Sequence, residues 1–307
     1  MRSFLQAAVI CTSLFLSCAA AAQSAEPGAH IAELRGKLGR ELNRIAASFD
    51  GAIGLAVKDF TSGDVLAINA DMIFPQASSI KVAVLIELLR QDQAAILKLS
   101  ERVEVRKTQF VGGSGVLQSF GDGESSLSLH DLAVLMIVLS DNSATNILID
   151  RVGRARVNEN MASLHLPQTR LERRMIDLDA ERLGKENLST PREMIALYDL
   201  LFHGKALDGK HTAIALEILK TPKDPATPLG KGLPSGVLIA DKHGVLDGVR
   251  ANSGIVLLDG RPYAISVMTA YAADGDDAER TISEISRRVY SYFERQAHSN
   301  AHGVRVP

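Results

Sequence analysis

A serine and a lysine three residues apart form the first pattern in this chain that could do chemistry. Ser78 and Lys81 stand at the start of an apolar run over 82–89, just after Pro75. Residues three apart share one face of a helix, so the Lys81 amine can reach the Ser78 hydroxyl and accept its proton. The unpaired N–H groups of a first helical turn can also stabilise an oxyanion. The spacing therefore predicts a nucleophilic serine at the start of a buried helix.

Two further polar patterns are candidates for the same site. Ser140, Asp141 and Asn142 interrupt an apolar helical run, which costs stability unless their hydrogen bonds are used. Lys242 and Gly244 follow a strand-like segment, so they would lie on an edge strand where a substrate could bind. The chain thus carries S-x-x-K on a helix, S-D-N between helices and K-x-G on a strand, in that order.

Together these three patterns resemble the signature of the class A serine β-lactamases and penicillin-binding proteins. The segment 233–242 closely resembles the class A form of the third pattern, and the segments 113–115 (Gly-Ser-Gly) and 190–191 (Thr-Pro) are also similar. The resemblance covers residues 30–298, nearly the whole chain. It implies a β-lactamase/DD-peptidase-like α/β sandwich, in which helices flank an antiparallel sheet and an all-α domain is inserted, with no cofactor or metal.

The resemblance also implies a catalytic set. Ser78 would be the acylated nucleophile and Lys81 its proton partner. Ser140 and Lys242 would pass a proton to the leaving nitrogen and hold the substrate carboxylate. The expected function is therefore opening of β-lactam rings through a Ser78 acyl-enzyme. The alternatives are a related serine amidase, esterase or DD-peptidase, or a penicillin-binding sensor that deacylates slowly.

The implied substrate-binding residues include one departure from the family. Asn142 would bind the substrate amide, and the N–H groups of Ser78 and Val245 would form the oxyanion hole beside Gly244. His243 stands where Thr or Ser is usual, and its imidazole could bind an anion or simply be tolerated. At the position of the family's distal arginine the chain has Ser253, and the nearby guanidinium at position 250 is a possible replacement.

A second departure lies in the loop after S-D-N. In class A enzymes this loop carries R-x-E-x-x-x-N, whose glutamate orients the deacylating water. Aligned on Arg174, the glutamate position holds Ile176. Asp177 is the nearest carboxylate and our candidate for a substitute base, with Asp179 and Glu181 as fallbacks; the other interpretation is that all three are solvated loop charges.

Hydrophobic periodicity predicts the elements that position these residues. We expect strands over 51–59, 64–69, 236–241, 254–258 and 263–271. We expect helices over 31–47, 78–89, 132–139, 143–152, 191–203, 213–219 and 277–296, those between the strands forming a region of helices alone. Strands at both ends predict an α/β domain over 30–75 and 227–298, an all-α domain over 76–226, and a substrate site in the cleft between them.

Residues 1–22 are typical of a secretory signal. Arg2 precedes an apolar stretch over 4–16, and three alanines at 20–22 suggest a cleavage site. Cys11 and Cys18 both lie in this segment, so the mature chain needs no disulfide; lipidation at Cys18 is an alternative that the flanking residues fit poorly. We expect a secreted, periplasmic protein.

Charge and composition favour a small-molecule enzyme over a nucleic-acid binder. The formal net charge of −2 becomes −3 once Arg2 is removed with the signal. The apolar part of the signal is too short for a membrane span. His298 and His302 are four residues apart but have no third ligand, so we expect no metal site. We expect a monomer that binds a small β-lactam or related amide or ester, without nucleic acid.

Overall fold

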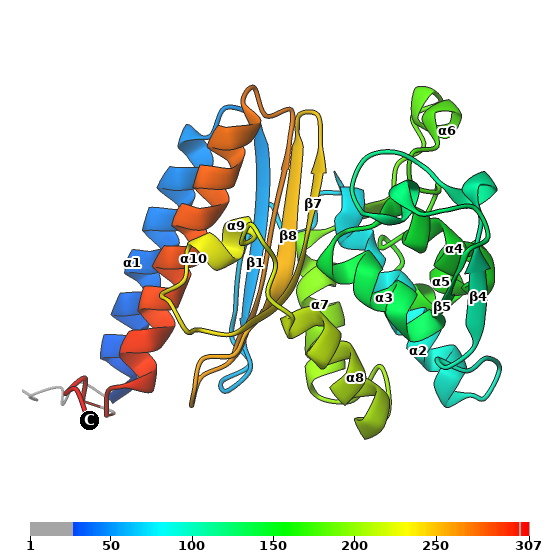
Figure 1. Cartoon of the computed structure of the whole chain (residues 1–307). Coiled ribbons are helices and arrows are strands. Elements are labelled where there is room, and N and C mark those ends of the chain that lie inside the picture. Colours follow the sequence, from blue (N-terminus) through cyan, green and yellow to red (C-terminus); the bar gives the residue numbers. More distant parts are fainter. Residues whose placement is uncertain (1–26, 301, 307) are drawn as a thin grey trace, which may run out of the picture.

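An antiparallel sheet covered by helices on both faces forms the centre of the molecule (Figure 1). The computed structural model describes residues 27–300 and 302–306, so the predicted signal at 1–22, with Cys11 and Cys18, lies outside the described residues. The sheet has five strands in the order β2-β1-β9-β8-β7. Their bounds are β1 Ala52–Asp59, β2 Val65–Ile68, β7 Ile239–Leu246, β8 Val249–Val256 and β9 Tyr263–Ala270. The predicted fold class is confirmed.

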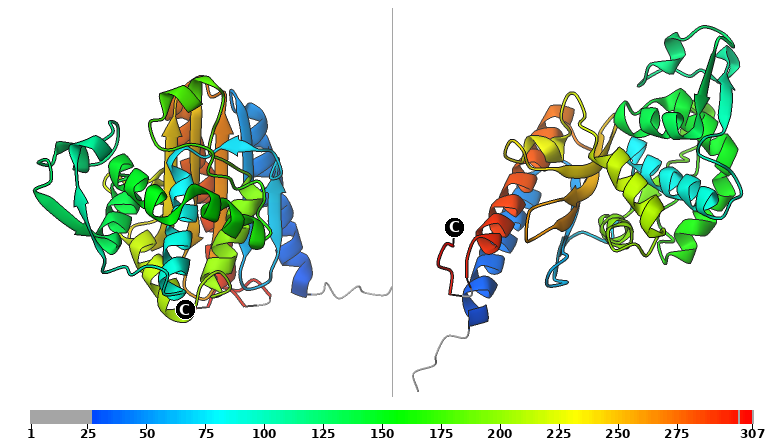
Figure 2. Two further views of the ribbon diagram at one scale, coloured as in Figure 1. Left: turned by 90° about the vertical axis from the view of Figure 1, so that its right-hand side faces the viewer. Right: turned by 60° about the horizontal axis from the view of Figure 1, so that its bottom comes forward.

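Three helices from the two ends of the described chain cover one face of the sheet. They are α1 Pro27–Ser48, α9 Pro228–Lys231 and α10 Gly275–Ala297. In Figures 1 and 2, α1 and α10 lie side by side along the strands. Apolar residues three or four apart on α10, such as Ile282, Ile285 and Val289, are buried against the sheet. This packing forms the first of two hydrophobic cores, which lies between the sheet and helices α1 and α10.

The other helices form the opposite side of the molecule. They are α2 Lys81–Gln93, α3 Leu129–Val138, α4 Asn142–Val152, α5 Arg154–Ser163, α6 Leu178–Arg182, α7 Pro191–Phe202, α8 Gly209–Lys220 and the 3-10 helices η1 Ala77–Ile80, η2 Lys107–Gln109 and η3 Leu117–Ser119. Helix α7 packs on β1, β8 and β9, and α8 packs on β7. Both chain ends thus build the sheet, as expected, while the proposed domain boundaries stay a prediction.

Helix α2 lies at the centre of this helical side. Every residue from 81 to 89 is buried. Helix α3, whose sequence is apolar from Leu132 onward, buries Leu132 and Met136, while Leu139, just after its end, is 43% exposed. A uniformly apolar run does not show which of its sides meets a neighbour.

The structure corrects two further expectations. The region between the helices also contains strands: β4 Arg102–Val105 pairs with β5 Ser125–Ser128, and β3 Phe74–Pro75 pairs with β6 Leu188–Ser189. These strands are only two or four residues long, at or below the shortest run in which alternation indicates a strand. Strand β7 does not stop at 241 but runs to Leu246, and the chain turns at Asp247 and Gly248, where Gly248 has φ 67°. Lys242, His243 and Gly244 therefore lie within a paired strand.

Within the described residues, no helix is long and apolar enough to cross a bilayer.

Candidate active site

A cavity of about 210 Å³ lies where η1, α4 and β7 meet. Ser78 of S-x-x-K and Asn142 of S-D-N line it, and so does Val245, the residue that directly follows K-x-G, so the three predicted patterns meet at the same space. Ser78 sits in η1, which runs directly into the buried helix α2. The residue before it, Ala77, has φ 47°, a conformation that a residue with a side chain adopts at a cost. The predicted serine is thus partly exposed at the start of a buried helix.

Lys81 lies behind Ser78 and is fully buried. Its Nζ is 2.7 Å from the Ser140 carbonyl oxygen, 3.0 Å from Asn142 Oδ1 and 3.1 Å from Ser140 Oγ. Burial, and next the charge of Lys242, hold the pKa of the Lys81 amine well below its usual range, while Asp141 acts in the opposite direction. Among the described contacts of Nζ there is no hydrogen bond to Ser78, a catalytic contact that often forms only when substrate binds. The arrangement gives a desolvated amine one helical turn from the serine.

The S-D-N segment turns between α3 and α4 and uses its hydrogen bonds. Ser140 has φ 53°. The Asp141 carboxylate accepts bonds from the N–H groups of Ala144 at 2.9 Å, Val116 at 2.7 Å and Leu117 at 2.9 Å. The polar break therefore fixes the 111–117 segment beside the cavity, which explains why three polar residues are tolerated there.

The Gly-Ser-Gly segment at 113–115 wraps closely around S-D-N. The N–H of Asn142 donates to the Ser114 carbonyl at 3.0 Å. A Cβ on Gly115 would come within 2.3 Å of the Asp141 carboxylate, and one on Gly113 within 2.8 Å of Asn142 Nδ2. Both glycines also have positive φ, of 108° and 81°. These two positions therefore require glycine.

Strand β7 approaches Ser78 at Gly244. A Cβ there would lie 2.3 Å from the Gln76 carbonyl oxygen and 2.8 Å from the Ser78 nitrogen. The Ser79 hydroxyl donates to the Lys242 carbonyl at 3.2 Å, which ties the strand to η1. Only glycine lets the two backbones come this close, so the glycine of K-x-G brings the backbone of Val245 next to that of Ser78.

Lys242 is fully buried and paired in register with Ser253 of β8. Its Nζ donates to the His243 carbonyl at 2.7 Å. Burial lowers the pKa of the Lys242 amine to about 7; the carboxylate of Asp241 opposes this shift and the charge of Lys223 adds to it. Near neutral pH this lysine is therefore close to its titration point.

His243 differs from its neighbour in charge and direction. Desolvation, and next the charge of Lys242, lower the pKa of its imidazole to about 4, so the ring is uncharged at neutral pH. Side chains alternate along a strand, and Asp241, two residues away, bonds to Asn252 at 2.8 Å beneath α9. An uncharged ring on the same side of the strand as Asp241 is poorly suited to bind an anion. The part of His243 in substrate binding stays a prediction. Arg250 bonds to Glu279 of α10, at 3.3 Å, on that same side.

The buried arginine of the loop before α6 is Arg173, whereas the sequence alignment placed the arginine of the family motif at Arg174. The side chain of Arg173 is 6% exposed and bonds to Glu186 at 3.0 Å and 3.2 Å, whereas Arg174 is 45% exposed and pairs with Asp150. Aligned on Arg173, the glutamate position of R-x-E-x-x-x-N is Met175. Either alignment puts an apolar residue, Met175 or Ile176, at the glutamate position of the motif. Both residues line the cavity.

Two asparagines that sequence reasoning missed hold this loop. Asn146 accepts from the Met175 N–H at 2.8 Å and donates to its carbonyl at 3.0 Å. Asn187 accepts from the N–H groups of Glu172 and Arg173 at 2.8 Å and 3.0 Å. Asn146 lies on α4 four residues after Asn142, so the same helical face was the signal that could have shown it.

The carboxylates of the loop divide into two groups. Asp177 caps α6 by accepting from the Ala180 N–H at 3.0 Å and does not line the cavity, and neither does the exposed Asp179. Glu181 and Glu186 do line it. The geometry thus favours Glu181 over Asp177 among the three candidates, and the part of Asp177 in water activation stays a prediction.

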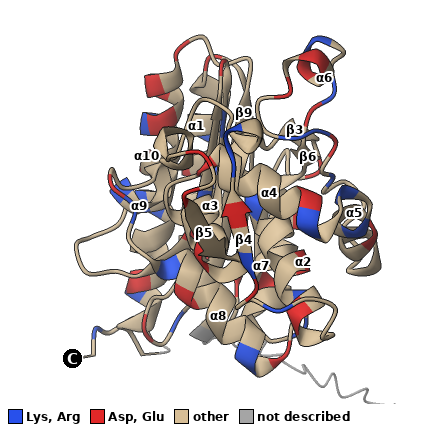
Figure 3. Ribbon diagram, turned by 45° about the vertical axis from the view of Figure 1, so that its right-hand side comes forward, with Lys and Arg blue, Asp and Glu red and all other residues tan. Residues whose placement is uncertain are grey.

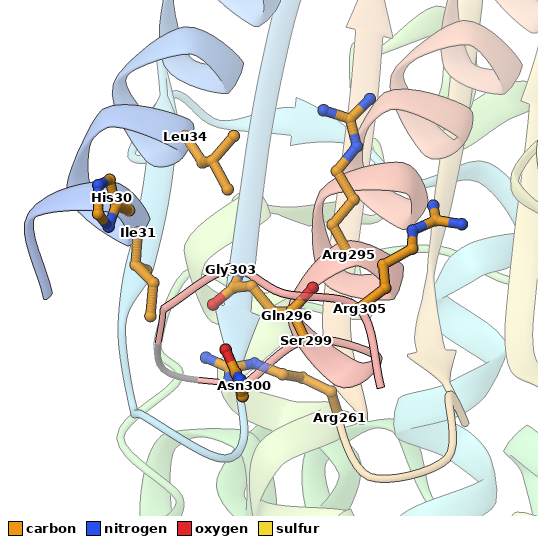
Figure 4. Close-up of a pocket in the computed structure, with 10 residues that line it drawn as sticks. All are labelled: His30, Ile31, Leu34, Arg261, Arg295, Gln296, Ser299, Asn300, Gly303 and Arg305. Carbon is orange, nitrogen blue, oxygen red and sulfur yellow. The ribbon is translucent and has the colours of Figure 1, made fainter. Parts of the chain in front are cut away.

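A larger cavity, of about 520 Å³, lies on the other side of the sheet (Figure 4). The start of α1, the end of α10 and the tail line it. Figure 4 shows the Arg261 guanidinium turned toward Asn300, while those of Arg295 and Arg305 point elsewhere, so the three cations do not converge on one ligand. Among the residues with described positions, no group of three or more potential ligands could hold a metal ion.

A sequence model of the beta-lactamase enzyme family matches residues 37–293. The chain belongs to this family. Beta-lactamase SME-1 of Serratia marcescens is 26% identical over 255 residues, covering 81% of this chain and 86% of that protein. Beta-lactamase PSE-4 of Pseudomonas aeruginosa is 24% identical over 263 residues, covering 84% and 91%.

Solved structures agree with the family assignment. An ancestral class A beta-lactamase superposes with a TM-score of 0.78 and 26% identity, covering 83% of this chain and all of that one. PBP-A superposes with a TM-score of 0.77 and 27% identity, covering 84% and 96%. The chain therefore has the class A serine beta-lactamase-like fold. Within this family, the chain departs from R-x-E-x-x-x-N by having an apolar residue at the glutamate position, and that position lines the cavity.

Proposed function

We propose that the chain is a secreted serine hydrolase that opens β-lactam rings by forming an acyl-enzyme at Ser78. The observation that carries this proposal is the buried Lys81 amine, one turn from Ser78, in contact with both Ser140 and Asn142. Burial lowers the pKa of this amine, which favours the neutral form that can accept the Ser78 proton. Membership in the beta-lactamase family supports the same reaction class.

In the proposed reaction, one bond forms at Ser78 and the ring C–N bond breaks before water takes part. Ser78 Oγ attacks the ring carbonyl carbon, its proton passes to Lys81, and the N–H groups of Ser78 and Val245 stabilise the oxyanion. The ring C–N bond then breaks, and Ser140 passes a proton to the nitrogen. Lys242 in its ammonium form holds the substrate carboxylate. Water later hydrolyses the resulting ester and restores the serine.

Hydrolysis of this ester is the step for which the site has the fewest suitable catalytic groups. A carboxylate that positions and deprotonates water contributes about 10²- to 10⁴-fold, and Met175 and Ile176 stand at the corresponding place. We therefore infer rapid acylation by about one equivalent, followed by slow turnover. The same feature favours a second candidate function, a penicillin-binding sensor that stays acylated. One solved relative, a leucine-to-glutamate variant of PBP-A, is an acyl-enzyme complex with penicillin G.

The test is a time course of the intact mass after addition of benzylpenicillin, with peptide mapping of the adduct. We expect a mass increase of one penicillin on Ser78 and none in Ser78→Ala. A label on Ser79 or Ser140 would contradict the assignment of the nucleophile. Turnover of the chromogenic β-lactam nitrocefin then separates the hydrolase, which continues after the burst, from the sensor, which stops. Nitrocefin turnover also separates β-lactam hydrolysis from an amidase, esterase or DD-peptidase activity.

The setting of the enzyme is part of the proposal. The signal-like segment at 1–22 supports export to the periplasm, and we propose a monomer acting on a small substrate without nucleic acid. Amino-terminal sequencing of the exported protein, with a start near Gln23 expected, tests the cleavage site. A chain that keeps residues 1–22 would contradict it.

A further inference from the structure

The cavity beside Ser78 has more negative than positive charge on its outer wall. Glu181, Glu186 and Arg173 all line it. Arg173 makes its short contacts with Glu186, through Nη2 at 3.0 Å and Nε at 3.2 Å. The Glu181 carboxylate comes no closer than 3.6 Å to the same guanidinium. One guanidinium thus balances Glu186, and the charge of Glu181 is left in excess.

Exposure separates the two glutamates further. The side chains of Arg173 and Glu186 are 6% and 22% exposed, so their paired contact holds the loop in place. The Glu181 side chain is 47% exposed, so it can turn toward a ligand. It belongs to α6, a short helix with charges of both signs at the edge of the molecule (Figure 3).

The opposite end of the site is basic. Lys242 and Lys81 are buried behind Ser78, and the proposed mechanism places the substrate carboxylate at Lys242. A substrate held there with its amide on Asn142 would direct its acyl side chain into the cavity that Glu181 lines. A site with the Lys242 ammonium group at one end and an unbalanced carboxylate at the other is complementary to a ligand with both charges.

We propose that Glu181 selects substrates whose acyl group carries an ammonium group. This inference rests on the proposed function, because it needs an acyl-enzyme at Ser78. The pairing is half exposed, so its effect is that of a surface ion pair, about two- to fivefold in the rate constant of acylation. Salt should reduce it, since about 1 M salt shortens the screening length to about 3 Å.

Ampicillin and benzylpenicillin provide the test, because they differ only by an amino group beside the side-chain carbonyl. The second-order rate constant of Ser78 acylation is measured for both by intact mass at about pH 6, where an α-amino group is protonated. The proteins compared are the unmodified chain, Glu181→Gln and Asp179→Asn. Asp179 is the matched control: it lies on the same helix, is 89% exposed, pairs with Arg182 and does not line the cavity.

We expect the ampicillin-to-benzylpenicillin ratio to fall about two- to fivefold in Glu181→Gln and to stay unchanged in Asp179→Asn. In about 1 M salt the difference between the unmodified chain and Glu181→Gln should shrink. An equal ratio in the unmodified chain and Glu181→Gln, or an equal fall in both variants, would overturn the selection by Glu181 while leaving the proposed function intact. If neither penicillin labels Ser78, both proposals fail.

Discussion

The two walls of the cavity beside Ser78 are built differently. One wall is formed by Ser78 and Asn142, and behind it Lys81 is fully buried and bonds to Ser140 and Asn142. On the other wall, the loop before α6 presents Met175 and a half-exposed Ile176. The first wall has the groups that the proposed acylation needs, whereas the second lacks a carboxylate where the family motif places one. In the proposed mechanism, acylation and hydrolysis thus depend on separate parts of one site.

Removing the amine from the first wall should have the largest effect. Lys81→Met fills a similar volume but has no lone pair to accept the Ser78 proton, so we expect acylation by benzylpenicillin to slow by about 10²- to 10⁴-fold. The rate of mass increase measures this. Lys98→Met, at an exposed lysine, is the control and should react as the unmodified chain does. Acylation of Lys81→Met at an unchanged rate would remove this lysine from proton transfer.

Adding a carboxylate to the second wall should have the opposite effect on the later step. Met175→Glu places a carboxylate at the glutamate position of the family motif, so we expect loss of the acyl-enzyme to accelerate by about 10²-fold or more. The decay of the penicillin adduct in intact mass measures the rate.

Ile176→Glu distinguishes the two possible alignments of the loop. If the structure-based alignment on Arg173 is right, Met175→Glu should accelerate deacylation more than Ile176→Glu. A larger effect at 176 would restore the alignment on Arg174. No acceleration in either variant would mean that the second wall does not limit hydrolysis.

The pH dependence of acylation tests Lys242. A lysine is charged below its pKa, so with a pKa of about 7 this residue loses its ammonium form as the pH rises above neutrality. We expect the second-order rate constant of acylation to fall by up to about tenfold per pH unit above pH 7. Lys242→Arg keeps its charge throughout this range and should show no such fall. A fall that begins only near the ordinary lysine pKa, or an identical profile in both proteins, would contradict this interpretation.

The smallest effect is expected at Asp177. Asn is as good a helix cap as Asp, so Asp177→Asn should keep α6 and change the slow steady-state rate less than about twofold. Steady-state nitrocefin turnover measures this rate. If the variant loses the slow phase and keeps the burst, Asp177 is the substitute base after all.

Local sequence rules predicted the parts of the site that depend on local structure. Three-residue spacing placed Ser78 and Lys81 together. Ser128 and Thr190, each three residues before a carboxylate, cap their helices by accepting bonds from the Asp131 N–H and the Glu193 N–H. These features need only a helix and its first turn. They were therefore readable before any tertiary contact was known.

The second wall could not be predicted in this way. Arg173 and Arg174 are adjacent and chemically identical, and only the fold shows that the first is buried against Glu186. In the same way, Asp177 is nearer in sequence to the motif position than Glu181, but its carboxylate is used as a helix cap. The course of a loop depends on distant residues such as Asn146, which periodicity does not report.

The contact between β7 and η1 joins parts of the chain that are made at different times. Gly244 and Ser78 are 166 residues apart (244 − 78), yet their backbones pack against each other. While the chain is being synthesised, the serine and its lysine emerge long before the strand that carries the second N–H of the proposed oxyanion hole. Pairing of β1 with β9 spans a still longer stretch, and contacts of such long range form slowly. The proposed site of acylation is therefore assembled only when the late strands close the sheet.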